Sequence, residues 1–142
     1  MGEFPRLIAT VLDAEDAPAL AAFWRDYLGL AYRPGQGPAD DPGFIVLDDD
    51  TGSPKLAVQQ VASLPAPTWP AAGTPAQMHL DLFVPGLEAQ QHQVDRAIGL
   101  GARVLDDRST DAADPLVVLA DPAGHPFCLI APPVAGDEGR AQ

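Results

Sequence analysis

The sequence has only one cysteine, Cys128, among 142 residues. An intrachain disulfide and a cysteine-rich zinc site are therefore both excluded. Positive charge is also scarce, since 8 Lys and Arg against 20 Asp and Glu leave a net charge of -12. Phosphate binding needs a surface rich in Lys and Arg, so we expect neither nucleic acid nor an anionic membrane as a partner. The acidic balance suits a cationic ligand, although solubility alone also explains it.

Long apolar runs are missing as well. No run approaches the roughly 20 residues needed to cross a bilayer, and the first ten residues lack the pattern of a signal peptide. We therefore expect a cytoplasmic protein. What the chain does have is 46% hydrophobic and only 20% charged residues. This composition indicates a folded domain of ordinary size rather than a disordered chain.

The first half of the sequence predicts a strand, a helix and three further strands. Residues 6–12 are apolar and partly β-branched, and we expect Asp13 to end the strand that they form. Asp16 can cap the N-terminus of a helix, and Gly29 can end it. Between them, apolar side chains recur at helical spacing as Leu20, Phe23, Trp24, Tyr27 and Leu28. Further strands are expected at residues 30–33, 44–47 and 56–61.

A proline-rich stretch, residues 62–76, follows the first half. Its prolines exclude a helix or a central strand, and they are Pro65, Pro67, Pro70 and Pro75. We expect this stretch to be a linker. Trp69 lies within it and is a candidate for a lid over a binding cleft or for a subunit interface.

The second half repeats the order of the first. Residues 77–84 alternate as a strand does, with Met78, Leu80, Leu82 and Val84 on one face and His79, Asp81 and Phe83 on the other. A helix is expected at residues 87–100, ending at Gly101. Three more strands are expected at residues 102–105, 116–120 and 126–130. Residues 132–142 are small and polar and are expected to fray.

This pattern predicts an α+β fold made of paired βαβββ modules. The expected modules are residues 1–61 and 77–131, joined by the linker 62–76 and followed by the tail 132–142, all within one structural domain. A curved sheet with one helix buries only one of its faces well. Two such sheets together would leave a cleft, which is a common place for a ligand.

Four stretches of sequence resemble a known family. They are residues 11–30, residues 58–61, residues 67–82 with the segment Gln77-Met78-His79-Leu80-Asp81-Leu82, and residues 119–129 with the turn Asp121-Pro122-Ala123-Gly124. Together they are similar to the glyoxalase-like, actinobacterial branch of the vicinal oxygen chelate superfamily. This superfamily includes glyoxalases, bleomycin resistance proteins and dioxygenases. The resemblance covers about residues 7–131 and implies the same paired βαβββ fold.

The resemblance also implies where a metal would bind. Enzymes of the superfamily typically hold a divalent metal with residues from the first, fifth and eighth strands, often with one more from the fourth. Those positions correspond here to Ala9, Gln59, His79 and Cys128. Ala9 cannot bind a metal, and Gln59 is a weak neutral donor. Only His79 matches well, so we expect no cofactor, with a divalent metal at His79 as the alternative.

The candidate site residues each have a second interpretation. His79 is either a cleft residue or a structural histidine paired with Asp81, which itself either orients the imidazole or forms a satisfied pair with it. Cys128 is either a buried small hydrophobe or a reactive thiol. Gln59 either faces the cleft or lies on a solvated edge. With Trp69, these residues form the expected ligand-binding cleft.

Two functions follow from these residues. The first is a homodimeric protein that binds a cationic or aromatic small molecule in the cleft between its modules, without a full metal site. The second is a metal-dependent lyase, isomerase or dioxygenase-like enzyme that uses His79 with a non-standard set of ligands. Fold alone does not decide between them.

Overall fold

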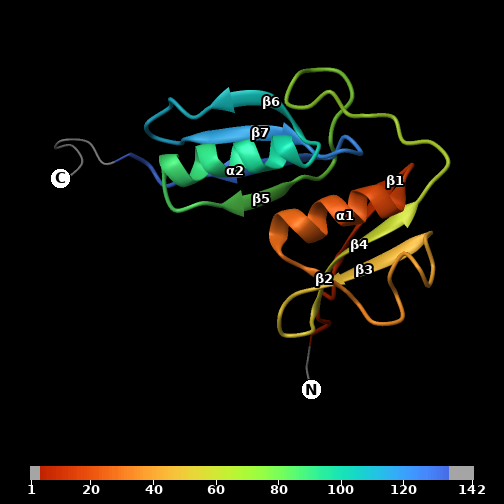
Figure 1. Ribbon diagram of the computed structural model, residues 1–142. Coiled ribbons are helices and arrows are strands. Elements are labelled where there is room, and N and C mark those ends of the chain that lie inside the picture. Colours follow the sequence, from red (N-terminus) through yellow and green to blue (C-terminus); the bar gives the residue numbers. More distant parts are fainter. Residues whose placement is uncertain (1–3, 135–142) are drawn as a thin grey trace. The chain divides into compact units, whose positions relative to one another are not determined.

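The computed structural model describes residues 4–134 and contains two units, one ending at Pro65 and the other beginning at Ala66 (Figure 1). The division falls within the proline-rich stretch 62–76. Each unit has the order strand, helix, strand, strand, strand. The predicted α+β fold of paired βαβββ modules is therefore confirmed.

The first unit is one four-stranded sheet with a helix on one face. Its elements are β1 (Thr10–Ala14), α1 (Ala17–Leu28), β2 (Ala31–Tyr32), β3 (Phe44–Asp48) and β4 (Pro54–Gln60). The strand order is β1-β4-β3-β2, with β1 parallel to β4 and the other neighbours antiparallel. Helix α1 packs against β1, β3 and β4. We call the opposite face the open face of the first sheet.

Helix α1 begins and ends where the sequence predicts. The Asp16 side chain accepts a hydrogen bond from the Ala19 backbone N–H at 3.2 Å, which caps the first turn. Gly29 ends the helix in the left-handed conformation, with a φ of 69°. The buried face of the helix is aromatic: it carries Phe23, Trp24 and Tyr27.

The second unit repeats this arrangement. Its elements are β5 (Leu80–Phe83), α2 (Leu87–Gly99), β6 (Arg103–Arg108), β7 (Leu116–Ala120) and β8 (Pro126–Ile130). The strand order is β5-β8-β7-β6, with β5 parallel to β8. Helix α2 packs against β6 and β8. The opposite face is the open face of the second sheet.

Helix α2 is anchored by an amide. Gln90 is 1% exposed, and its Nε2 donates hydrogen bonds to the carbonyl oxygens of Pro115 at 3.2 Å and Leu129 at 2.9 Å. A buried amide without partners would be costly, so these two bonds fix the position of the helix on β8. The apolar stripe on this helix is correspondingly short, with Val94 and Ala97 buried beside Gln90.

The first strand differs from the prediction. It begins at Thr10 rather than at residue 6, and it runs through Asp13 instead of ending there. The reason is its pairing with β4, because the ladder extends from Thr10 opposite Leu56 to Ala14 opposite Gln60. Pairing along this edge therefore overrides the weak strand preference of Asp.

The fifth strand is shorter than the predicted 77–84. It covers only Leu80–Phe83, because Gln77 has a φ of 64° and cannot be part of an extended strand. Met78, predicted to share a strand face with Leu80 and Leu82, lies before the strand and is 72% exposed. The alternation after it is confirmed: Leu80 and Leu82 are half-buried, while Asp81 and Phe83 are exposed. The sixth strand extends to Arg108, beyond its predicted end at residue 105.

The remaining predictions concern the linker and the ends of the chain. Within the described residues, the stretch 62–76 contains no helix or strand. No helix among residues 4–134 combines the length and apolar character that crossing a bilayer requires. Most of the tail that we expected to fray, residues 135–142, lies outside the described residues.

Candidate functional site

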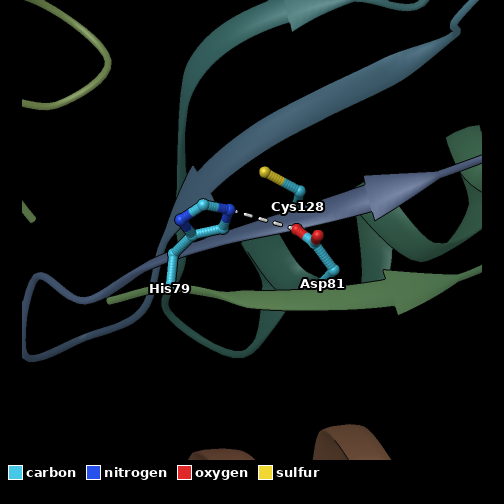
Figure 2. Close-up of side chains that lie close together, drawn as sticks. All are labelled: His79, Asp81 and Cys128. Carbon is cyan, nitrogen blue, oxygen red and sulfur yellow. Dashed lines mark ion pairs between the residues drawn. The ribbon is translucent and has the colours of Figure 1, made fainter. Parts of the chain in front are cut away.

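Three side chains that can bind a metal or a ligand meet on the open face of the second sheet (Figure 2). Strands β5 and β8 are parallel neighbours, and their register places Asp81 directly opposite Cys128. His79 comes two residues before Asp81, so it lies on the same face. The nitrogen, oxygen and sulfur atoms that these side chains offer all lie within 4.8 Å of one another. We call this set the His79 cluster.

Within the His79 cluster, histidine and aspartate form a close pair. His79 Nε2 lies 3.3 Å from Asp81 Oδ1, which makes an ion pair when the imidazole is protonated (Figure 2). The side chains are 34% and 56% exposed, respectively. The histidine is therefore paired with Asp81, and its side chain remains partly exposed; its role as a cleft residue stays a prediction.

Trp69 covers one side of the His79 ring. The indole and imidazole rings are stacked, with centroids 4.5 Å apart and planes 19° from parallel. The loop that carries Trp69 is closed by Thr68, whose N–H donates to Thr74 O at 2.8 Å and whose Oγ1 accepts from Thr74 N at 2.7 Å. A residue of the linker is thus part of the site. Sequence order alone does not show that Trp69 lies next to His79.

The Cys128 thiol is buried, with 4% of the residue exposed. Burial, the charge of Asp81 and a hydrogen bond to that carboxylate together raise the pKa of this thiol to about 11, and burial is the largest of the three causes. The thiolate is the nucleophilic form of cysteine, and at neutral pH this group is a thiol. The structure therefore favours the interpretation of Cys128 as a buried, unreactive group in the absence of a metal.

The predicted cleft residues are divided between the two units. Trp69, His79, Asp81 and Cys128 come together in the second unit. Gln59 is exposed on the open face of the first sheet, opposite Phe44 in the register of β3 and β4.

The neighbouring Gln60 has a role that the sequence analysis missed. It accepts a hydrogen bond from the Ala17 backbone N–H at 2.9 Å and so helps to cap α1. The sequence pattern does not distinguish the two adjacent glutamines. They differ in the structure because successive side chains on β4 point to opposite faces of the sheet.

The structure also shows a cavity that the sequence analysis missed. It has a volume of about 370 Å³ and lies on the open face of the first sheet, with Arg33 and Gln36 among its lining residues. Ala9, the position that corresponds to the first metal ligand of the superfamily, lines it as well. The sequence contained a signal for it, because Arg33 is a charged residue at the end of the predicted strand 30–33, whose other residues are apolar.

The donors of the His79 cluster suit zinc better than a hard cation. Histidine nitrogen, aspartate oxygen and cysteine sulfur are all common zinc ligands, and three protein ligands with one open position are typical of catalytic zinc sites. Mg²⁺ and Ca²⁺ prefer oxygen alone. Because the thiol pKa is about 11, a metal would have to displace the thiol proton in order to bind.

Comparison with known proteins adds the family context. A family described as a glyoxalase-like domain matches residues 9–130. A glyoxalase/bleomycin resistance protein/dioxygenase family enzyme from Burkholderia phytofirmans is 19% identical, with a TM-score of 0.66, over 89% of this chain and 98% of that one. The genomically encoded fosfomycin resistance protein from Listeria monocytogenes is 15% identical, with a TM-score of 0.64, over 98% and 99%. A lactoylglutathione lyase from Agrobacterium tumefaciens is 21% identical, with a TM-score of 0.55, over 92% and 96%.

No curated protein sequence matches the chain. At identities of 15% to 21%, the structural likenesses establish the fold alone. The resemblance to an actinobacterial branch stays a prediction.

Proposed function

Because the chain belongs to the family of glyoxalase-like domains and has the vicinal oxygen chelate fold, we propose that it binds a cationic or aromatic small molecule at the His79 cluster. The observation that carries this proposal is the stack of Trp69 on His79 beside the exposed carboxylate of Asp81. A flat aromatic surface next to a negative charge attracts cations through both the π system and the carboxylate. The net charge of -12 supports the same class of ligand.

A simple cation tests this proposal. Benzyltrimethylammonium combines a quaternary charge with an aromatic ring, and benzyl alcohol is its neutral counterpart. We expect calorimetry to detect binding of the cation and much weaker binding of the alcohol. Because a cation over an indole contributes roughly 0.5–2 kcal/mol, Trp69→Ala should weaken binding about threefold to thirtyfold.

Controls separate the site from the surface. Asp81→Asn should weaken binding of the cation and leave that of the alcohol unchanged, because it removes charge and keeps shape. His92→Ala changes an exposed residue of α2 and should have no effect. Equal binding by the wild-type protein, Trp69→Ala and Asp81→Asn would rule this site out.

A second function has its own supporting observation. The donor atoms of His79, Asp81 and Cys128 lie within 4.8 Å of one another, which favours a metal-dependent lyase, isomerase or dioxygenase-like enzyme. The three side chains would hold the metal, and the metal would polarise an oxygen of the substrate. Trp69 would cover the histidine ligand and shield it from water.

Elemental analysis of the purified protein tests the second function. We expect about one zinc per chain after dialysis against Zn²⁺, and its loss in His79→Ala. Because one thiol proton must leave, the affinity should rise roughly tenfold per pH unit near neutrality, and this slope should vanish in Cys128→Ala. No metal above background, and no activity on adding Zn²⁺, Ni²⁺, Mn²⁺ or Fe²⁺, would exclude it.

The expected homodimer stays a prediction. Exposed apolar side chains near the N-terminus support it, because Phe4, Leu7 and Ile8 are 78%, 85% and 64% exposed. Sedimentation equilibrium of the wild-type protein and of a variant with Leu7→Ser and Ile8→Ser tests it. We expect the variant to be monomeric at concentrations where the wild-type protein is a dimer.

A further inference from the structure

The cavity of about 370 Å³ on the open face of the first sheet has walls of two kinds. Most of its surface is apolar and comes from neighbouring strands, with Val11 on β1, Phe44 and Val46 on β3, and Ala57 on β4. We call it the first-sheet cavity. Its volume lies in the range of small-molecule pockets, roughly 300–1,000 Å³.

Arg33 supplies the polar part of the first-sheet cavity. Its Nη1 donates hydrogen bonds to Asp48 Oδ1 at 3.0 Å and to the Gly52 carbonyl oxygen at 3.4 Å. Asp48 is 6% exposed, so this ion pair holds the guanidinium in one place. A guanidinium has five N–H donors, and within residues 4–134 those on Nε and Nη2 have no protein partner.

A second donor group lies at the same cavity. Gln36 also lines it, and among the described residues its side-chain amide has no protein partner. Donors from Arg33 and Gln36 thus border an apolar wall. This combination fits an acceptor group joined to an apolar body.

We infer that the first-sheet cavity binds a small apolar carboxylate. The carboxylate accepts hydrogen bonds from the Arg33 guanidinium and the Gln36 amide, and the tail packs on Val46, Phe44 and Ala57. Arginine favours carboxylates because its planar donors match the two carboxylate oxygens. This ligand class differs in charge from the one proposed for the His79 cluster, so the inference goes beyond that function.

Octanoate and 1-octanol measure the contribution of the charge in the wild-type protein. Both have the same apolar chain, and we expect calorimetry to show about tenfold tighter binding of octanoate, because hydrogen bonds to charged groups contribute more than neutral ones. In a two-dimensional NMR titration, the amide signals of Val46 and Ala57 should shift and the Trp69 indole signal should not. Equal affinities, or shifts confined to Trp69, would overturn the inference.

Matched variants locate the ligand. Ala9 lines the cavity and precedes β1, so Ala9→Leu should fill the space and abolish octanoate binding. Ala19 is exposed on α1 and outside the cavity, so Ala19→Leu should bind octanoate as the wild-type protein does. Undiminished binding by Ala9→Leu would contradict the inference.

A third variant tests the role of Arg33 directly. Arg33→Gln should weaken octanoate binding about tenfold and leave 1-octanol unaffected. Asp48 loses its partner in this variant. If the variant does not fold for that reason, Ala9→Leu, Ala19→Leu and the comparison of octanoate with 1-octanol in the wild-type protein still test the inference. None of these variants changes His79, Asp81 or Trp69, and the Trp69 indole signal serves only as a control, so failure here leaves the proposed function of the His79 cluster untouched.

Discussion

The two sheets share one backbone arrangement and carry opposite chemistry on their open faces. In both, the first strand pairs in parallel with the last strand of the unit, from Thr10 opposite Leu56 and from Leu80 opposite Phe127. This register defines equivalent positions in the two units. They are Ala9 and His79, Val11 and Asp81, and Ala57 and Cys128.

The comparison shows how one fold supports two kinds of site. The first sheet has only apolar side chains at these positions, and a cavity results. The second has a nitrogen, an oxygen and a sulfur donor, and a polar cluster results. The same backbone frame therefore presents different side-chain chemistry on its two open faces.

The two helices also differ in how they are held on their sheets. Helix α1 packs through an aromatic cluster in which Trp24 lies edge-on to Phe23, with ring centroids 5.0 Å apart. Helix α2 has less apolar surface and relies on the two hydrogen bonds of Gln90. Four predictions test how far this difference between the units extends.

The largest effect is expected in the first unit. Trp24 is fully buried, so Trp24→Ala should lower the free energy of unfolding by about 3–5 kcal/mol through lost burial and the resulting cavity. Urea denaturation followed by circular dichroism measures this. Trp69→Ala, which removes a half-buried linker residue, should cost clearly less; equal losses would contradict the larger contribution expected of the buried aromatic cluster.

The second prediction concerns Cys128 at alkaline pH. Its pKa is about 11 in the folded protein against an ordinary value of 9.0. Between these values the unfolded chain has lost a proton that the folded protein still holds, so stability decreases as the pH rises from 9 to 11. The loss should reach about 2–3 kcal/mol. Cys128→Ala should remove this part of the pH dependence, and an unchanged slope would contradict the assignment.

The third prediction concerns the amide anchor of α2. Gln90→Ala should lower the free energy of unfolding by about 1–3 kcal/mol, because the carbonyl oxygens of Pro115 and Leu129 lose their donor. The adjacent Gln91 is exposed, and Gln91→Ala should change stability by less than about 0.5 kcal/mol. Hydrogen exchange should show faster opening of α2 in the first variant alone.

The smallest effect is expected at the helix N-termini. Asp16 caps α1, whereas α2 begins after Gly86, and within residues 4–134 no side chain makes a cap hydrogen bond there. A Cβ added to Gly86 meets no atom within 4 Å, and its φ of -178° is open to any residue. Gly86→Asp should therefore raise stability by a few tenths of a kcal/mol. A loss on thermal denaturation would show that this N-terminus has no room for a cap.

Much of the fold could be predicted because the signals are local. Asp16 and Gly29 mark the ends of α1 by capping, and the predicted strands 116–120 and 126–130 coincide with β7 and β8. The errors occur where pairing decides. Strand β1 includes Asp13 because β4 provides ladder partners, and β5 begins late because of the backbone conformation of Gln77.

The site could be predicted only in part. His79 and Asp81 share a face by simple alternation, which the sequence shows directly. The closeness of Cys128 depends on the parallel register of β5 and β8, and the stack of Trp69 on His79 depends on the closure of its loop by Thr68. The spacing of these residues along the sequence predicts neither of these two contacts.

The sequence by itself determined the order of elements, the repeat of the βαβββ pattern and the acidic character of the chain, because capping, periodicity and charge are properties of neighbouring residues. Only the tertiary structure decided that Asp81 faces Cys128, that the thiol is buried, and that Arg33 borders an apolar cavity on the first sheet. These features depend on strand register and loop closure, which bring together residues far apart in the chain. The chemistry of this protein is therefore set by contacts that its local sequence patterns do not reveal.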